Sequence, residues 1–426
     1  MLKSSRWLAL SAATLLIAGI AGPGTAVAQD DTTITVRSLW GGSEQEAFQK
    51  VLDAFKEKTG ITAVYESVRD DYAGVLRTDI TGGNPPDVAI IPGIGYLRGL
   101  VGDGAVVKIA DLGLDPAALE ANFPPGMLEV GKVAGDLYAL MVKFNTKSSM
   151  WFSPERFAAL GVEPAADWEA FVALLAAIKA AGGSPLALGA GDSWTLTDWF
   201  ESIYLRMAGP EMYDQLFGGQ LPWTDQSVVD AIEALKGVLN DDNVAGGITA
   251  SLGRRFVDDI GQVFSANPEA EILYEGGFVG GIATGQVNPD LEIGKTIDWF
   301  SFPSINGGDG VTIGGDVIAA LTTDPGVREF VEFMTSPEAG EAWAATGAVI
   351  SPILGVDSSV YPNALVTKEA DQVANASAVR FDGSDLLPAG MGDALGAALQ
   401  GAIQGQDVAA LLGALDQAVT AAWESE

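Results

Sequence analysis

The sequence predicts an α/β fold organised in two or three lobes, and three observations support that prediction. Between residues 33 and 91, segments rich in β-branched residues alternate with an amphipathic helical segment, an order typical of a parallel sheet with helices on its faces. The chain has 426 residues, which is long for a single hydrophobic core. Its middle part is more helical and is rich in aromatic residues between 189 and 223. Because we find no internal repeat and no low-complexity linker, we expect lobes joined by several short chain crossings.

The first predicted elements are strands at 33–39, 61–65 and 87–91 and a helix at 44–58. The helix follows a break at Gly41-Gly42-Ser43 and carries one apolar stripe at i, i+3, i+4 and i+7, formed by Phe48, Val51, Leu52 and Phe55. In parallel sheets ligands bind beyond the carboxyl ends of the strands. The first such end holds Trp40 in a glycine-containing loop beside a helix start, an arrangement typical of a binding loop.

Later elements follow from the same patterns. Helical apolar faces occur in 168–178 and 228–235, and a glycine-rich turn with one carboxylate and one aromatic residue spans 275–281. A buried strand is predicted at 317–321, followed by short helices at 327–334 and 340–345 and a helical pair within 395–423.

Composition excludes several classes of chemistry. The chain has no cysteine and no histidine, which removes disulfides, Ser-His-Asp and Cys-His nucleophiles and the usual zinc ligand sets. The net charge of −33 disfavours nucleic acid and anionic lipid and favours a soluble monomer. We predict no catalytic residue, no cofactor and no metal.

The first 28 residues have the layout of a secretory signal peptide. Lys3 and Arg6 precede an apolar run from Trp7 to Ile20, and a small-x-small site follows at Ala26-Val27-Ala28. The run is too short to span a membrane. We expect cleavage after Ala28 and, because no cysteine is present for lipid attachment, a periplasmic protein without a lipid anchor.

Several motifs in the rest of the chain occur in a characteristic order. They are Asn84-Pro85-Pro86-Asp87-Val88, Gly135 to Leu140 with Phe144-Asn145, Trp151 to Gly161 followed by Trp168, and Phe330 to Glu338 followed by Ile350-Ser351-Pro352. With these motifs the chain resembles the extracellular sugar-binding proteins of bacterial ABC importers (extracellular solute-binding protein family 1), the class that includes maltose- and α-glucoside-binding proteins. The missing lipid-anchor cysteine departs from most Gram-positive members and favours a Gram-negative periplasm.

The resemblance implies a two-lobed periplasmic-binding-protein fold with a ligand cleft between the lobes and three hinge crossings, near 142–143, 314–315 and 350–351. The N-terminal lobe would comprise 29–142 plus 315–350, and the C-terminal lobe 143–314 plus 351–426. It also implies a function: capture of a neutral sugar, an α-glucoside or short oligosaccharide, by hinge closure, and delivery to the transmembrane subunits of an ABC permease. Such a protein is not an enzyme.

A sugar site stacks aromatic rings on apolar sugar faces and directs carboxylates or amides to the hydroxyl rim. Candidate residues of these types lie in predicted loops, at helix starts and at the crossings: Trp40, Ser43, Glu44, Tyr72, Asn145, Trp194, Asp198, Trp199, Trp223, Glu275, Phe278, Gly315, Asp316, Arg380 and Asp385. Glu275 and Phe278 are included because they match the glycine-turn segment of the family. Core packing is the alternative for Trp40, Trp199 and Trp223, and a surface salt bridge is the alternative for Arg380 and Asp385.

Two other functions remain open at the level of sequence. A secreted glycoside hydrolase could use Glu275 with Asp316 or Glu44, although no motif fixes the separation of two such carboxyls. A binding protein for a polyamine, amino acid or metal would keep the fold and change the ligand; a polyamine would suit the acidic composition.

Overall fold

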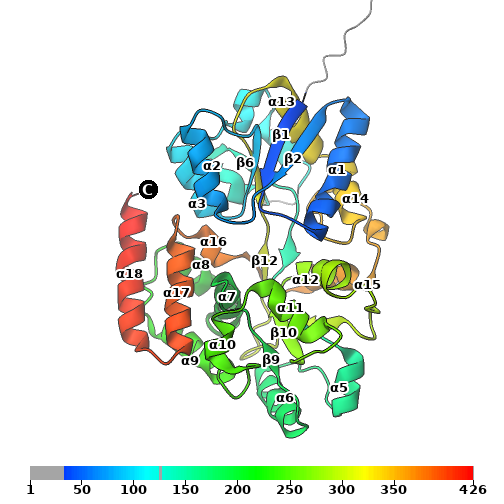
Figure 1. The fold of residues 1–426 in the computed structure, drawn as a ribbon. Coiled ribbons are helices and arrows are strands. Elements are labelled where there is room, and N and C mark those ends of the chain that lie inside the picture. The colour runs from blue at the N-terminus through cyan, green and yellow to red at the C-terminus, as the bar shows by residue number, and fades with distance from the viewer. Residues whose placement is uncertain (1–32, 124–126, 426) are drawn as a thin grey trace, which may run out of the picture. The chain divides into compact units, whose positions relative to one another are not determined.

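The computed structural model describes residues 33–123 and 127–425 (Figure 1). The described residues cluster into one compact unit. The predicted signal peptide and its cleavage site lie outside the described residues. Within the described part of the chain, no helix is both long enough and apolar enough to cross a membrane.

The first lobe is built on a five-stranded sheet in the order β2-β1-β3-β13-β6. The predicted parallel arrangement is confirmed for β1, which pairs in parallel with both β2 and β3. The fourth strand, β13, comes from late in the chain and runs antiparallel to both of its neighbours. The strands are β1 (Thr33–Ser38), β2 (Thr62–Ser67), β3 (Val88–Ile91), β13 (Val317–Ala320) and β6 (Ala139–Met141), with a separate hairpin of β4 (Lys132–Val133) and β5 (Asp136–Leu137).

The helix after β1 illustrates how sequence dictates packing in this lobe. Helix α1 spans Ser43–Thr59, one residue longer at each end than predicted, and its apolar stripe is buried. Phe55 on this stripe packs edge-on against Phe330, with ring centroids 5.2 Å apart. The other helices of the lobe are α2 (Tyr72–Thr81), α3 (Ile94–Gly102), α4 (Pro116–Glu120), α13 (Pro325–Met334) and α14 (Pro337–Ala344), with 3₁₀ turns η1 (Ile109–Leu112) and η2 (Glu129–Gly131).

The second lobe contains two small sheets. One has the order β11-β8-β10-β9 and the other β14-β12-β7. Their strands are β7 (Asn145–Thr146), β8 (Ser149–Phe152), β9 (Leu186–Ala187), β10 (Ile272–Glu275), β11 (Asp298–Ser301), β12 (Val311–Gly314) and β14 (Val379–Phe381).

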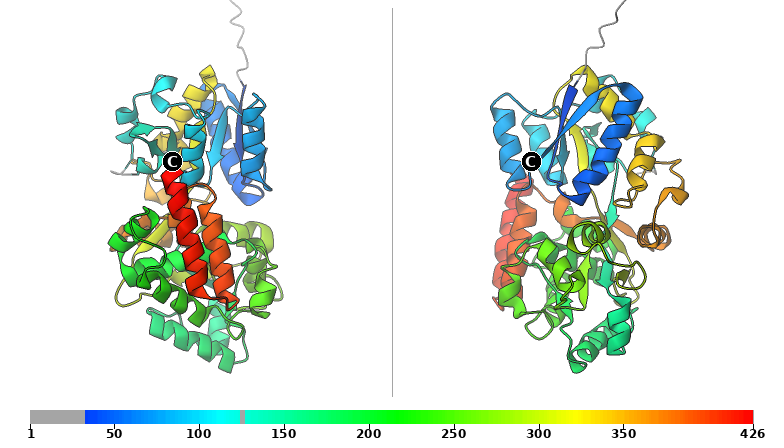
Figure 2. Two further views of the ribbon diagram at one scale, coloured as in Figure 1. Left: turned by 90° about the vertical axis from the view of Figure 1, so that its left-hand side faces the viewer. Right: turned by 45° about the vertical axis from the view of Figure 1, so that its right-hand side comes forward.

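Helices make up most of the second lobe, as the sequence predicts. The predicted terminal pair is present as α17 and α18, which pack side by side (Figure 2). The helices are α5 (Pro154–Leu160), α6 (Trp168–Ala180), α7 (Trp194–Ala208), α8 (Pro210–Phe217), α9 (Gln226–Val238), α10 (Gly247–Ser251), α11 (Phe256–Phe264), α12 (Phe278–Ile282), α15 (Ala364–Asn375), α16 (Gly383–Leu386), α17 (Met391–Ile403) and α18 (Val408–Ser425), with a π-helical turn η3 (Ala283–Val287) and a 3₁₀ turn η4 (Ser358–Val360).

The chain passes between the sheets of the two lobes at short segments. Strand β6 ends at Met141 in the five-stranded sheet, and β7 begins at Asn145 in the three-stranded sheet. The return from β12 to β13 uses Gly315 and Asp316. A third segment lies beside the first, because Phe144 and Ile350 exchange backbone hydrogen bonds. The lobe boundaries given above remain our assignment.

Candidate ligand-binding site

A polar cluster of the first lobe gathers around Asp316, between β12 and β13. The indole Nε1 of Trp40 donates to Asp316 Oδ2 at 2.6 Å, and Lys143 Nζ lies 3.3 Å from the same oxygen. Lys143 Nζ also lies 4.7 Å from the centroid of the Trp40 ring. We call Trp40, Glu44, Lys143 and Asp316 the first-lobe cluster; its central carboxylate already has a donor and a cation.

Trp40 is held where it is by the end of β1 and the start of α1. Its ring packs edge-on against Phe48 and Trp343, with centroids 5.2 and 5.5 Å away, and its carbonyl oxygen accepts hydrogen bonds from Tyr65 and Ser67. The turn into α1 requires Gly42, whose φ of 60° and ψ of −132° no side-chain-bearing residue adopts readily. The ring of Trp40 thus belongs to the core, which is the alternative considered for it, and its N–H faces the polar cluster.

Glu44, in the first turn of α1, completes this cluster. Burial raises the pKa of its carboxyl and the charge of Asp316 adds to that rise, whereas Lys143 and Arg69 oppose it. A half-buried acid in these surroundings can accept or donate a hydrogen bond, depending on its protonation.

A second polar cluster lies in the second lobe, around Lys147. Lys147 Nζ donates to Asp198 Oδ1 at 3.1 Å and also to Asp382 Oδ2. Although burial acts to lower the pKa of Lys147, the charges of Asp198 and Asp382 raise it well above its usual value. We call Lys147, Asp198, Glu275 and Asp382 the second-lobe cluster.

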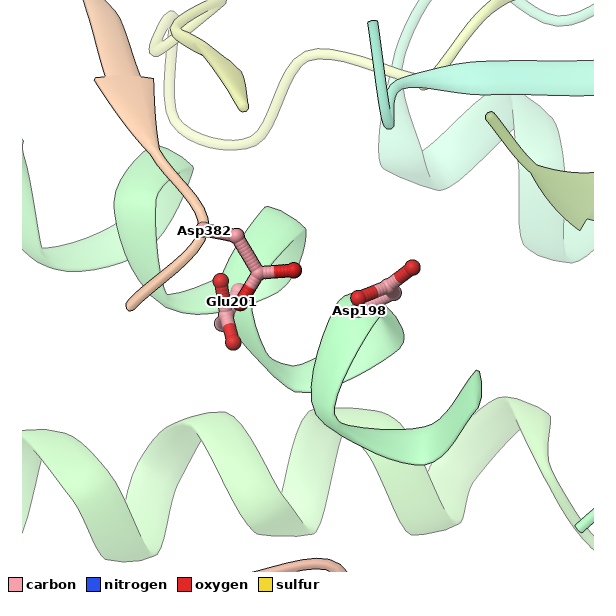
Figure 3. Close-up of side chains that lie close together, drawn as sticks. All are labelled: Asp198, Glu201 and Asp382. Carbon is pink, nitrogen blue, oxygen red and sulfur yellow. The ribbon is translucent and has the colours of Figure 1, made fainter. Parts of the chain in front are cut away.

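Figure 3 shows Asp198 and Glu201 on α7, with Asp382 beside them on the segment that follows β14. Carboxylate oxygens of these three residues lie within 4.8 Å of one another, as metal ligands could. These carboxylates, however, already have donors from the protein itself. Glu201 accepts hydrogen bonds from Tyr213 and from the backbone N–H groups of Gly383 and Ser384, and Lys147 neutralises the other two. We therefore assign no metal here.

Glu275, the last residue of β10, differs from the other acids of this cluster. It is 1% exposed, neither carboxyl oxygen has a close protein donor, and the carboxyl lies near that of Asp198, within reach of a shared proton, and near the Gly276 N–H. Asp198 Oδ2 is likewise buried without a donor. Burial, followed by the charge of Asp198, raises the pKa of Glu275 well above its usual value. Burial also raises the pKa of Asp198, to about 7.

Aromatic residues border the second-lobe cluster. Trp194 begins α7 and is half-buried, with the rings of Phe256 and Phe278 at 4.9 and 6.2 Å. Lys147 Nζ lies 5.6 Å from the Trp194 ring. Aromatic faces next to carboxylates form the combination expected of a sugar site.

The two clusters are close in space. The charges of Asp382 and Asp316, one from each cluster, both act on Asp385, whose pKa is raised well above its usual value, first of all by burial. Ser43 Oγ of the first lobe accepts a hydrogen bond from Gln286 Nε2 of the second at 2.9 Å. Ten of the fifteen predicted residues thus belong to or border the clusters: Trp40, Ser43, Glu44, Trp194, Asp198, Glu275, Phe278, Gly315, Asp316 and Asp385.

Other predicted residues lie elsewhere. Trp199 and Trp223 are 1% and 2% exposed within the hydrophobic core of the second lobe, where Trp199 packs on Tyr274 and Trp223 on Phe217. Tyr72 is buried in the core of the first lobe, and its hydroxyl donates to Arg37 O. These three are apolar packing residues, so we omit them from the proposed site.

Arg380 and Asn145 also have structural partners. Arg380 forms an ion pair with Asp214 at 2.6 Å, which is the surface salt bridge considered as its alternative. It lines a separate cavity of about 230 Å³, together with Arg98, Phe217 and Trp423. There, Arg98 of α3 donates to Leu386 O at 2.8 Å, and its guanidinium lies 5.0 Å from the Trp423 ring. The Asn145 amide is buried and donates to Ala348 O.

Sequence reasoning missed the cations of the site. Lys143 and Lys147 flank Asn145 closely, and Asp382 lies in a loop that was singled out only for Arg380 and Asp385. The available signal was that Lys143 lies in a predicted crossing and Lys147 four residues after it. It is a weak one, because most lysines are solvated.

Comparison with known proteins identifies the family of the chain and agrees with its fold. The family described as bacterial extracellular solute-binding protein matches residues 41–341. The chain is 30% identical over 385 residues to the osmoprotective compounds-binding protein GgtB of Synechocystis sp., covering 89% of this chain and 90% of that protein. It is 31% identical over 376 residues to the alpha-glucosides-binding periplasmic protein AglE of Rhizobium meliloti, covering 84% and 81%.

Solved structures share the fold at lower identity. The solute receptor AcbH, described as having an exclusive preference for β-D-galactopyranose, superposes with a TM-score of 0.80 at 18% identity, covering 92% of this chain and 99% of that one. A chitin oligosaccharide binding protein gives a TM-score of 0.77 at 20% identity, with the same coverage.

Proposed function

This chain belongs to the family of bacterial extracellular solute-binding proteins, which are binding proteins and not enzymes, and we propose that it captures a neutral sugar for an ABC importer. The observation that carries this proposal is the pair of polar clusters on facing lobes, one of which contains buried carboxyl oxygens with no close protein donor. Buried polar groups are almost always hydrogen-bonded. A ligand rich in hydroxyl groups supplies the missing donors.

The aromatic residues support a sugar rather than a simpler solute. Trp194 and Phe278 provide apolar faces beside Asp198 and Glu275, so one ligand can stack on a ring while its hydroxyls donate to the acids. Within this class we propose an α-glucoside or a short oligosaccharide. The relative named as binding alpha-glucosides is 31% identical to this chain.

Capture would proceed by closure of the two lobes. A ligand that contacts Trp40 and Asp316 on one lobe and Glu275 on the other has more contacts when the lobes are together, so it shifts the equilibrium toward that state. The closed complex would then be recognised by the transmembrane subunits of a permease. We propose that the protein does this as a monomer in the periplasm, after cleavage behind Ala28 and without a lipid anchor.

A thermal-shift panel on residues 29–426 tests the proposal. The panel holds α- and β-linked disaccharides, maltooligosaccharides, monosaccharides, polyols, polyamines and amino acids. A sugar at about 100 times its Kd stabilises the protein by about 2.7 kcal/mol, and we expect that response for some sugars. A response confined to polyamines or amino acids would contradict the sugar assignment while keeping the family.

Paired tryptophan variants then locate the site. Trp194→Ala should weaken sugar binding by about 10- to 100-fold, because it removes an aromatic face at the second-lobe cluster. Trp168→Ala is the matched control: Trp168 is also half-buried at the start of a helix, but it packs on Phe302 and Phe171. Equal losses in both variants, measured by titration calorimetry, would argue against a site at Trp194.

A further inference from the structure

Helix α3 of the first lobe lies directly against the segment of the second lobe that follows Asp385. Gly95 is the point of contact: a Cβ atom at this position would lie 1.8 Å from the carbonyl oxygen of Leu387, whose side chain belongs to the core of the second lobe. Three residues later in the same helix, Arg98 Nη2 donates to Leu386 O at 2.8 Å. Glycine at position 95 therefore allows a close approach of the two backbones that any side chain would prevent.

A second direct contact between the lobes joins the start of α1 to the π-helical turn η3. A Cβ atom on Gly42 would lie 2.8 Å from the side chain of Gln286, and one on Gly285 would lie 3.2 Å from Cβ of Ser43. Ser43 and Gln286 are also joined by the hydrogen bond of 2.9 Å. Two glycines thus let the lobes meet closely beside Glu44, the next residue of α1.

Each contact adjoins a different part of the candidate site. The contact at Gly42 is next to Glu44 of the first-lobe cluster. The contact at Gly95 is next to Asp385, whose backbone N–H donates to Asp382 of the second-lobe cluster at 3.2 Å. A ligand between the clusters therefore meets a junction of the two lobes at both of these places.

Two other borders of the site are also bridged between the lobes. At the crossings, Phe144 and Ile350 exchange backbone hydrogen bonds. Near Trp194, Arg255 of the second lobe lies 3.7 Å from Asp70 of the first. This ion pair is exposed to solvent, so it is weaker than the contacts at the glycines.

We propose that Gly42 and Gly95 limit the length of the ligand: they let the lobes close directly on each other around a sugar of one or two rings, and chains of three or more rings are excluded. This inference rests on the proposed sugar-binding function and narrows its ligand class. A longer chain has to pass between the lobes at one of the junctions, and it then holds them apart. Because closure gives the ligand its contacts with both clusters, a chain that prevents closure loses one set of contacts.

A length series on the wild-type protein tests the inference without any variant. Titration calorimetry compares maltose, maltotriose and maltotetraose, and in parallel sucrose, raffinose and stachyose, with glucose and methyl α-glucoside as probes of one ring. We expect the tightest binding from a sugar of one or two rings, and a loss of about 100-fold or more when a third ring is added. A sugar of three or four rings that binds as tightly as its two-ring parent overturns the inference alone. Wild-type protein that binds no sugar overturns the proposed function and the inference together.

A matched pair of glycine variants in α3 tests the contact itself. Gly95→Ala places a methyl group against Leu387 O, whereas a Cβ atom on Gly99 would have no neighbour within 4 Å. Alanine favours a helix at both positions, and separation of the lobes relieves the clash at position 95, so we expect denaturation to show that both variants are folded.

The two variants should differ in binding. Gly95→Ala should bind the short sugar about 10- to 100-fold more weakly than the wild type, because a smaller fraction of the molecules can close. Gly99→Ala should bind it like the wild type. Equal affinity in all three proteins, or an equal loss in both variants, overturns the inference.

Discussion

The two polar clusters that face each other across the lobes differ in how completely the protein satisfies them. Asp316 of the first lobe receives the Trp40 N–H and lies next to Lys143. Glu275 of the second lobe has no close protein donor, and Asp198 uses only one oxygen. Both acids lie where the lobes meet. The protein itself supplies a hydrogen-bond donor and a cation to Asp316, but it supplies no close donor to Glu275.

We infer from this difference that the two clusters have different roles in binding. The first-lobe cluster is pre-organised, with Asp316 fixed by its partners before a ligand arrives. The second-lobe cluster keeps unsatisfied oxygens at the cost of stability, as functional sites often do. In the function that we propose, ligand hydroxyls supply the missing donors and recover that free energy.

The largest effect should come from removing the one cation of the second-lobe cluster. Lys147→Met leaves Asp198 and Asp382 buried without their counter-ion, and breaking a buried pair typically costs about 3–5 kcal/mol. Lys143→Met is the control from the first lobe, where the cation has one carboxylate partner, which keeps the Trp40 N–H. Chemical denaturation should show a smaller loss for Lys143→Met; equal losses would contradict the proposed asymmetry.

Buried acids should also make stability depend on pH. Asp259, outside both clusters, has a pKa raised to about 8, first of all by burial, and Glu369 has one raised to about 7 for the same reason. At these two groups the folded state binds a proton more tightly than the unfolded chain. The stability that they contribute is therefore fully present below about pH 4 and declines as the pH rises toward the folded-state pKa of each group, by about 1.4 kcal/mol per unit for each titrating group.

Replacing Asp259 shows how much of the pH dependence of stability this residue causes. Asp259→Asn should flatten the pH dependence of the denaturation midpoint between about pH 4 and about pH 8, and it should leave sugar affinity unchanged, because the residue pairs with Arg254 and belongs to neither cluster. A profile identical to that of the wild type would show that Asp259 does not titrate there.

The first-lobe cluster can be tested through its tryptophan. Trp40→Phe keeps an aromatic ring in the core but removes the donor to Asp316, a hydrogen bond to a charged group worth about 1.5–3 kcal/mol. We expect a loss of stability in that range. Trp343→Phe, which changes a ring packed on Trp40, controls for ring size.

The smallest effect should come from the exposed hydrogen bond between Gln286 and Ser43. Gln286→Ala removes the hydrogen bond to Ser43 between the lobes, which is exposed to solvent, so sugar affinity should fall by only about two- to tenfold. A loss of affinity as large as that of Trp194→Ala would show that this exposed contact contributes as much to binding as the clusters do.

The sequence predicted elements whose patterns are local. The stripe of α1, the alternation in β1 and the glycine break between them depend on neighbouring residues and were placed within one residue. The candidates near Trp40 and Glu275 also came from local signals, namely a loop after a strand and a glycine turn.

What the sequence could not predict depends on distant segments. Lys147 acts only because Asp198 and Asp382, from α7 and the segment after β14, converge on it. Trp199 and Trp223 resemble ligand residues in sequence, but neighbouring aromatic rings enclose them in the core. From the sequence alone, it is not apparent whether a tryptophan is covered by another aromatic ring of the protein or by a bound solute.

The contact of Arg98 with Trp423 makes one indole sensitive to the arrangement of the lobes. The guanidinium belongs to the first lobe and the ring to the second, so any change in the distance between the lobes moves a positive charge relative to that ring. Indole emission responds to nearby charge. The difference in fluorescence between wild type and Trp423→Phe therefore isolates, among the 10 tryptophans of the chain, a signal that follows lobe movement in real time without an attached dye.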